Sequence, residues 1–169
     1  MNTKYELTSE TTTAPDGTTL YRIRALANFG TITAGMLGGF IASEANLSVS
    51  GTAWVFDSAQ VSGSARVTDS ARVFGTARVF GSAQVSGTAW VTEILPVATR
   101  SDGHTFLITK DKDDNLVIIA GCRYFTIEQA REHWSQTRGG TPLGDESLAI
   151  VDHLERMATI RGWRKGGRP

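Results

Sequence analysis

A six-residue repeat dominates the chain. Seven consecutive hexads run through residues 51–92, each beginning with Gly or Asp and carrying Ala at its third and Val at its fifth position. A short fixed period means that each unit buries its apolar side only by stacking on its neighbours. In an extended strand, residues two apart point to one face, and Gly or Asp followed by Ser or Thr is typical of turns. The repeat therefore predicts short strands separated by corners, around a thin core of alanine and valine.

The hexad frame extends beyond the seven clear copies. Residues 45–50 place Leu47 and Val49 at the inward positions, and residues 93–98 place Leu95 and Val97 there. We therefore expect nine hexads over residues 45–98.

This pattern resembles the hexapeptide-repeat family. The resemblance is carried by the Val-x-Gly-Ser/Thr-Ala-x spelling of residues 51–92. It implies a left-handed parallel β-helix with three hexads per turn, so that nine hexads would make about three coils. The predicted fold class is mainly β, with this short helix as its centre.

The flanking segments have different patterns. Residues 1–44 indicate a β-hairpin cap, with strands at Tyr5–Thr8 and Thr19–Leu26, because a stacked repeat needs its open ends covered. Residues 99–169 indicate a small ββαα unit. Its expected elements are a hairpin over 104–121, a helix over 127–136 capped by Thr126, and a helix over 146–160 capped by Asp145, whose apolar stripe is Leu148, Val151, Leu154, Met157 and Ile160.

Composition narrows the class of protein. The formal net charge is zero, which disfavours a general nucleic-acid binder. A single cysteine excludes an internal disulfide framework and is typical of a reducing compartment. With no apolar run of membrane-spanning length and no apolar leader, we expect a cytoplasmic protein without membrane contact.

The outward positions of the repeat suggest a binding face. With three hexads per turn, residues eighteen apart stack, so Trp54, Arg72 and Trp90 form one column and Phe56 and Phe74 the next. A guanidinium between two indoles would form a cation–π stack. Three interpretations stay open: the C-terminal unit covers this face, the face joins copies in a dimer or trimer, or it binds a foreign protein.

Catalytic chemistry has little support in the sequence. The acyltransferases and carbonic anhydrases of the resembled family use histidines, yet residues 45–98 contain none. The three histidines, His104, His133 and His153, all follow the repeat. Cys122 could act as a nucleophile with His104 or His133 as its base, but a small buried thiol is the favoured interpretation. We therefore expect no catalytic residue, cofactor or metal.

A possible secondary surface follows the repeat. It comprises Arg138 and the basic end around Trp163, Arg164 and Lys165. Such residues could contact an acidic protein surface or a nucleic acid, although a solvated end is the favoured interpretation. Residues 138–146 are interpreted as a connector between the two helices.

The whole chain is also similar to uncharacterised proteins of enterobacterial phages and prophages. The similarity is carried by residues 21–25, 37–41, 120–126, 133–134 and 140–146. It implies a non-enzymatic accessory protein that binds and inhibits a host protein, such as a defence component. The alternatives are a self-assembling scaffold and an acyltransferase- or hydrolase-like enzyme.

Overall fold

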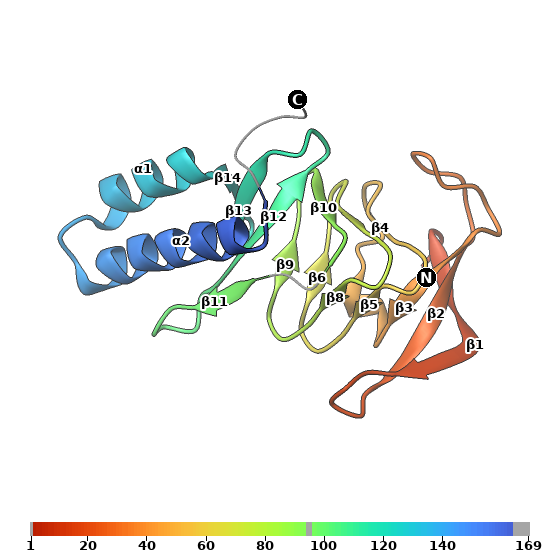
Figure 1. Ribbon diagram of the computed structural model, residues 1–169. Helices are drawn as coiled ribbons and strands as arrows, with labels where there is room; N and C mark the ends of the chain where they lie inside the picture. The colour runs from red at the N-terminus through yellow and green to blue at the C-terminus, as the bar shows by residue number, and fades with distance from the viewer. Residues whose placement is uncertain (1, 94–95, 164–169) are drawn as a thin grey trace. The chain divides into compact units, whose positions relative to one another are not determined.

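The computed structural model describes residues 2–93 and 96–163. The chain forms two compact units, Met1–Ile94 and Leu95–Pro169. The described part is mainly β, and both α-helices belong to the second unit (Figure 1). The predicted segments 1–44 and most of 45–98 thus lie in one unit.

The repeat folds into short strands that stack in parallel at a spacing of eighteen residues (Figure 1). Trp54 pairs with Arg72 and Arg72 with Trp90, while Gln60 pairs with Arg78. The strands are β4 (Trp54–Val55), β5 (Gln60–Val61), β6 (Arg66–Val67), β7 (Arg72–Val73), β8 (Arg78–Val79), β9 (Gln84–Val85) and β10 (Ala89–Val91). The predicted stacking of outward columns is confirmed by these pairs.

The core of the repeat consists of the predicted alanines and valines. In all seven hexads the third and fifth residues are at most 2% exposed. Burying a valine side chain contributes roughly 1.5–3 kcal/mol. The small alanine side chains keep this core thin, so the backbone segments around it lie close to one another.

Each corner of the repeat is made by a residue in the left-handed conformation. The first residue of every hexad has a positive φ: Gly51, Asp57, Gly63, Asp69, Gly75, Gly81 and Gly87. The two aspartates also bind the next coil, because the Asp57 carboxylate accepts from the Gly75 N–H at 3.0 Å and the Asp69 carboxylate from the Gly87 N–H at 2.9 Å. Asparagine and aspartate tolerate this conformation better than other residues with a side chain.

The predicted extension of the frame is wrong at both ends. Leu47, not Val49, lies opposite Val67, at a spacing of twenty residues, and Val49 is 56% exposed. Before the first clear hexad the register is therefore shifted by two residues. At the other end, Val97 is 41% exposed and lies in β11 (Val97–Thr99), which pairs antiparallel with β12 (Thr105–Asp111). Leu95 is outside the described residues.

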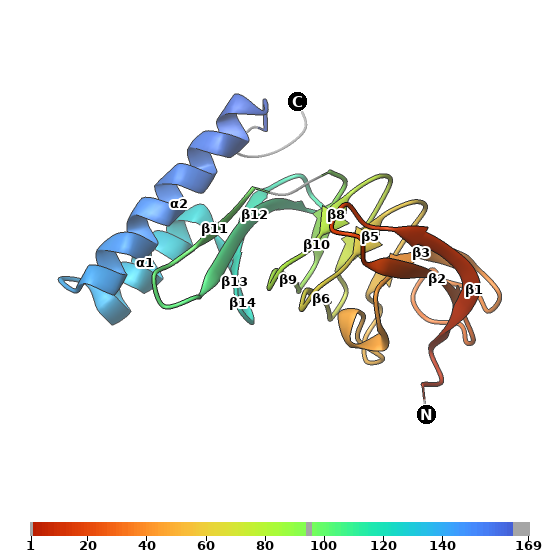
Figure 2. The same ribbon diagram turned by 90° about the horizontal axis from the view of Figure 1, so that it is seen from below.

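The N-terminal segment forms three strands that join the sheet of the repeat. Its strands are β1 (Tyr5–Thr13), β2 (Thr19–Ala25) and β3 (Leu37–Ile41), with β1 and β2 forming a hairpin (Figure 2). β2 pairs antiparallel with β3, and β3 pairs in parallel with β5 of the repeat. The resulting sheet, β1-β2-β3-β5-β8, mixes both directions.

Buried polar side chains join this cap to the repeat. The Lys4 ammonium donates to the carbonyls of Ser48 and Ala53, both at 2.9 Å, and its burial lowers the pKa of Lys4 to about 8. A 3-10 turn, η1 (Glu44–Asn46), places the Asn46 amide where it donates to the carbonyls of Gly63 and Ala65. These bonds satisfy backbone carbonyls that the end of the stack leaves without a strand partner.

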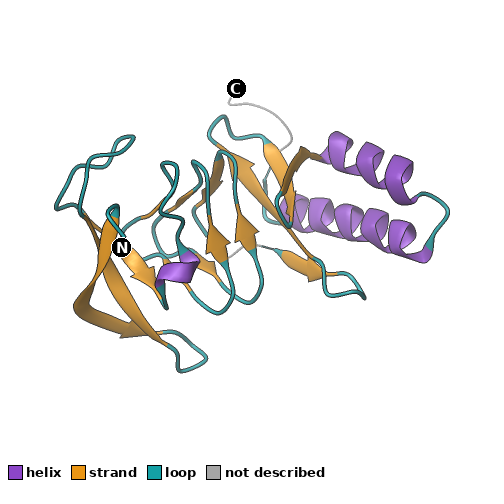
Figure 3. Cartoon of the chain, turned by 180° about the vertical axis from the view of Figure 1, so that it is seen from behind, coloured by secondary structure: helices purple, strands orange, loops and turns teal. Residues whose placement is uncertain are grey.

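The second unit is an antiparallel meander followed by two helices (Figure 3). Strands β11, β12, β13 (Leu116–Ala120) and β14 (Arg123–Thr126) pair in sequence order. Helices α1 (Ile127–Arg138) and α2 (Pro142–Ile160) pack on each other and are joined by ion pairs from Arg131 to Asp152 and Glu155. The predicted hairpin over 104–121 is confirmed, and β11 and β14 enlarge it to four strands.

One helix cap was predicted correctly and one was wrong. Thr126 caps α1 and forms a reciprocal capping box with Gln129. The second cap is Thr141, whose hydroxyl accepts from the Gly144 N–H at 3.1 Å, and not Asp145. Pro142 occupies the first position of α2, where a missing N–H costs nothing, so the helix begins earlier than expected.

The apolar stripe expected on α2 differs from the face that the helix buries, since only Val151 and Leu154 belong to both. The helix buries Gly144, Ser147, Val151, Leu154 and Ala158. Leu148 and Met157 are half-buried, and Ile160 is 69% exposed. Small residues on the buried face let α2 lie close to its neighbours. A pattern of large apolar side chains does not indicate such a face.

Two corner glycines differ in what surrounds them, and this difference can be measured. Gly51 and Gly81 have φ values of 71° and 66°. A Cβ at Gly51 would lie 2.3 Å from the Asp69 carbonyl oxygen, whereas one at Gly81 would meet nothing within 4 Å. We expect Gly81→Ala to lower the free energy of unfolding by about 1–2 kcal/mol, the cost of a left-handed alanine.

Gly51→Ala should lower stability by more than Gly81→Ala, because it adds a steric clash to the same backbone cost. Thermal and urea unfolding followed by circular dichroism would measure both variants. Equal losses would contradict the close stacking at the Gly51 corner.

Candidate functional site

The column of outward residues predicted as a binding face is only partly exposed. Trp54 is completely buried, since the rings of Tyr5 and Phe29 pack edge-on against it with centroids 6.2 and 5.4 Å away. The expectation that Trp54 belongs to an exposed face is therefore wrong. Sequence analysis missed this because the covering residues come from the N-terminal cap, far away in the chain.

The remaining members form a continuous aromatic ladder, defined here as Phe56, Arg72, Phe74 and Trp90. The Phe56 and Phe74 rings are stacked with centroids 4.4 Å apart, and Phe74 lies 5.3 Å from Trp90. The Arg72 guanidinium lies over Phe56 at 5.8 Å, which replaces the predicted sandwich between indoles. Trp90 is 39% exposed and the other three are half-buried.

A second aromatic feature of the first unit was not predicted. Phe80 is 54% exposed and borders a pocket of about 500 Å³. The pocket is lined by Ala14, Pro15, Asp16, Gln60, Ser62, Arg78, Val79, Phe80 and Gly81. Its wall from the β1–β2 turn could not be placed from sequence, although Phe80 stands at an outward hexad position.

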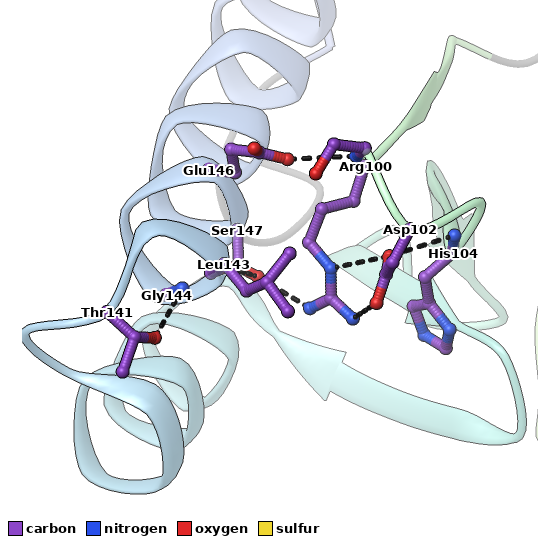
Figure 4. A network of polar contacts seen from close by, with 9 residues as sticks. Arg100, Asp102, His104, Thr141, Leu143, Gly144, Glu146 and Ser147 are labelled. Carbon is purple, nitrogen blue, oxygen red and sulfur yellow. Dashed lines mark hydrogen bonds and ion pairs between the residues drawn. The ribbon is translucent and has the colours of Figure 1, made fainter.

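A buried arginine organises the second unit (Figure 4). The Arg100 side chain is 3% exposed, and its Nε and Nη2 donate to the two Asp102 carboxylate oxygens at 2.9 and 2.7 Å. Its Nη1 donates to the Ser147 hydroxyl of α2 at 2.8 Å. The guanidinium also lies over the Trp134 ring, 5.1 Å from its centroid.

The network continues from Arg100 to the helix and to His104. The Ser147 hydroxyl donates to the Leu143 carbonyl, and the Glu146 carboxylate accepts from the Ser101 N–H at 2.8 Å. The backbone N–H of His104 donates to the Asp102 carboxylate (Figure 4). The His104 ring packs edge-on against Trp134. Hydrogen bonding from Arg100 lowers the pKa of Asp102 to about 2.

His104 and His133 lie on one pocket of about 580 Å³ in this unit. It is lined by Arg100, Asp102, His104, Arg123, His133, Trp134, Thr137 and Arg138. Burial, and then the charges of Arg123 and Arg138, lower the pKa of His133. Of the predicted secondary surface, Arg138 lines this pocket and Trp163 does not.

The other sequence candidates lie elsewhere. Cys122 is exposed at the turn between β13 and β14, where no hydrogen-bond partner of its thiol is found among residues 2–93 and 96–163, and His153 is exposed on α2. The expectation of a buried thiol is therefore wrong. Trp163 is buried and lies near the Lys110 and Arg161 cations, so it is not part of a solvated end. Arg164 and Lys165 lie outside the described residues.

No family model matches the chain, and no curated protein is significantly similar to it. Within residues 2–93 and 96–163, no group of three or more His, Cys, Asp and Glu side chains is arranged to hold a metal ion. No helix in the same residues is long and apolar enough to cross a membrane.

Because of the Arg100–Asp102 ion pair, we expect the free energy of unfolding to fall in acid. The pKa of Asp102 falls from 3.8 to about 2 in the folded chain, so the folded state binds this proton less readily than the unfolded state. The stabilisation is therefore complete above about pH 4 and is lost as the pH falls toward 2. Asp102→Asn should lower the urea midpoint at pH 7 and should flatten its pH dependence between pH 5 and 2.5.

Asp145→Asn is the matched control, because it removes an exposed carboxylate of the same unit that makes no ion pair among the described residues. Parallel pH curves for the wild type and Asp102→Asn would contradict the role of the pair.

Proposed function

We propose that this chain is a non-enzymatic binding protein, whose repeat forms a short parallel β-helix of the hexapeptide-repeat type and presents a side-chain surface to a protein partner. The parallel pairing of residues eighteen apart supports the three-hexad turn. Left-handed residues at every corner and a core of alanine and valine agree with such a helix. The left-handed course of the coils comes from the resemblance described above.

The observation that carries the proposal is the aromatic ladder. Exposed aromatic side chains beside an arginine are enriched at the centres of protein interfaces. Here Arg72 and Trp90 lie on short strands, and Phe56 and Phe74 directly follow such strands. The inward residues of these strands are buried, so little conformational entropy is lost when a partner binds. The ladder is a better candidate than the full predicted column, because Trp54 is already used in packing the cap.

The nature of the partner follows from the resemblance to enterobacterial phage and prophage proteins. We propose a phage accessory protein that acts in the host cytoplasm and inhibits a host protein, such as a defence component. Zero net charge agrees with a protein partner better than with nucleic acid.

A self-assembling scaffold is the second candidate, with one observation for it and one against it. The ladder could join two copies side by side, since apolar patches of this kind also form dimer interfaces. End-to-end stacking is disfavoured at the N-terminal end of the repeat, where β3 already pairs with β5 and carries the hairpin β1–β2.

Capture from host lysate tests the proposal. The tagged wild-type chain should retain a stoichiometric host protein, identified by mass spectrometry, and Trp90→Ala should weaken that complex by at least about tenfold. Phe80→Ala is the matched control, since it truncates an exposed aromatic residue on another side of the same repeat.

Mass in solution separates the two candidates. A monomer that retains a partner through Trp90 supports the binding protein, and an assembled mass without a partner supports the scaffold. A partner lost in Phe80→Ala but kept in Trp90→Ala would contradict the ladder as the binding surface.

A further inference from the structure

The 580 Å³ pocket of the second unit carries an excess of positive charge. Among the described residues that line it, Asp102 is the only acidic one, and both of its carboxylate oxygens accept from the buried Arg100 guanidinium. Arg123 and Arg138 contribute two further guanidinium groups, and neither forms an ion pair within the part of the chain that the structure describes. After Arg100 and Asp102 cancel, two positive charges are left on the pocket wall.

Both arginines line the pocket together with His133, Arg123 from β14 and Arg138 from the end of α1. Burial, and then the charges of these two arginines, lower the pKa of the His133 imidazole. His133 is itself held in place, with its ring stacked on Phe125 at 5.0 Å and edge-on to Trp134 at 4.7 Å. The cations and the imidazole thus surround one region of the pocket on a fixed aromatic support.

Two buried ring nitrogens of the pocket residues lack a partner among residues 2–93 and 96–163. Trp134 is 4% exposed, and its indole Nε1, which can only donate a hydrogen bond, has no acceptor there. The His104 Nε2 is also buried without a partner in the same residues. Leaving such groups unsatisfied costs roughly 1–3 kcal/mol each, and the Trp134 N–H calls for an acceptor.

From this arrangement we propose that the pocket binds a small organic phosphate through its phosphate group, with Arg123 and Arg138 as the principal ligands and His133 and Trp134 beside them. A phosphate monoester dianion matches the two uncompensated charges. Its oxygens suit the planar fork of arginine, which binds phosphate in a bidentate manner.

The size of the pocket points to a small molecule. Its volume lies within the range of about 300–1,000 Å³ that is typical of small-molecule sites, and it exceeds what a bare phosphate ion needs. The half-buried ring of His133 offers a flat surface to the organic part. This inference is independent of the aromatic ladder, because no residue is shared.

Titration with phenyl phosphate and with inorganic phosphate, followed by the Trp indole N–H resonances in nuclear magnetic resonance spectra, tests the proposal. The Trp134 resonance is assigned by its loss in Trp134→Phe. We expect it to shift on addition of phenyl phosphate while that of Trp163 stays unchanged, and we expect phenyl phosphate to bind more tightly than inorganic phosphate.

Arginine variants provide the second arm. Arg123→Gln combined with Arg138→Gln should weaken phenyl phosphate binding by at least tenfold. Arg156→Gln, which removes an exposed arginine of α2 outside the pocket, should leave it unchanged. Circular dichroism and the unperturbed Trp54 resonance would establish that each variant is folded.

Three outcomes would overturn the proposal. They are the absence of a Trp134 shift at millimolar phenyl phosphate, equal affinity in the wild type and the double arginine variant, and inorganic phosphate binding as tightly as phenyl phosphate. A phosphoserine-containing peptide that binds more tightly than phenyl phosphate would assign the pocket to a phosphorylated protein instead, and would overturn the small-molecule assignment.

Discussion

The left-handed backbone at the first residue of each hexad is the constraint on which the first unit depends. A positive φ at this position turns the chain, and the turn returns each strand to a place above the strand eighteen residues earlier. Only then are the Ala and Val side chains buried together and the outward residues aligned in columns. The ladder of Phe56, Phe74 and Trp90 is thus a consequence of corner geometry, and the residues between the corners need only be extended.

The second unit depends on a single buried charge in a comparable way. Arg100 holds the loop after β11 through Asp102 and reaches α2 through Ser147, while its guanidinium rests on Trp134 of α1. A buried cation is tolerated only when its hydrogen bonds are satisfied, so these contacts must form together. They also position the wall of the basic pocket, on which His104 and Trp134 lie.

Local patterns in the sequence predicted those features of the fold that depend on residues close together in the chain. The hexad core, the stacking columns, the hairpin over 104–121 and the Thr126 cap all follow from periodicity or capping chemistry within a few residues. The predictions were wrong where burial depends on residues far away in the sequence or where packing uses small side chains. Trp54 is covered by Tyr5 and Phe29, and α2 packs through Gly144, Ser147 and Ala158. The residues that line the basic pocket come from the loop 100–104, from β14 and from α1, so no spacing in the sequence predicts it.

The aspartate corners have a consequence for how such a chain can vary in length. The Asp57 and Asp69 carboxylates each accept from an N–H eighteen residues ahead, at Gly75 and Gly87. Removing one hexad between an aspartate and its glycine would move that carboxylate away from its partner and would shift the following outward residues to a neighbouring column. Removing three hexads would keep the remaining outward residues in their own columns. We therefore expect this repeat to tolerate insertions and deletions of eighteen residues, and not those of six or twelve.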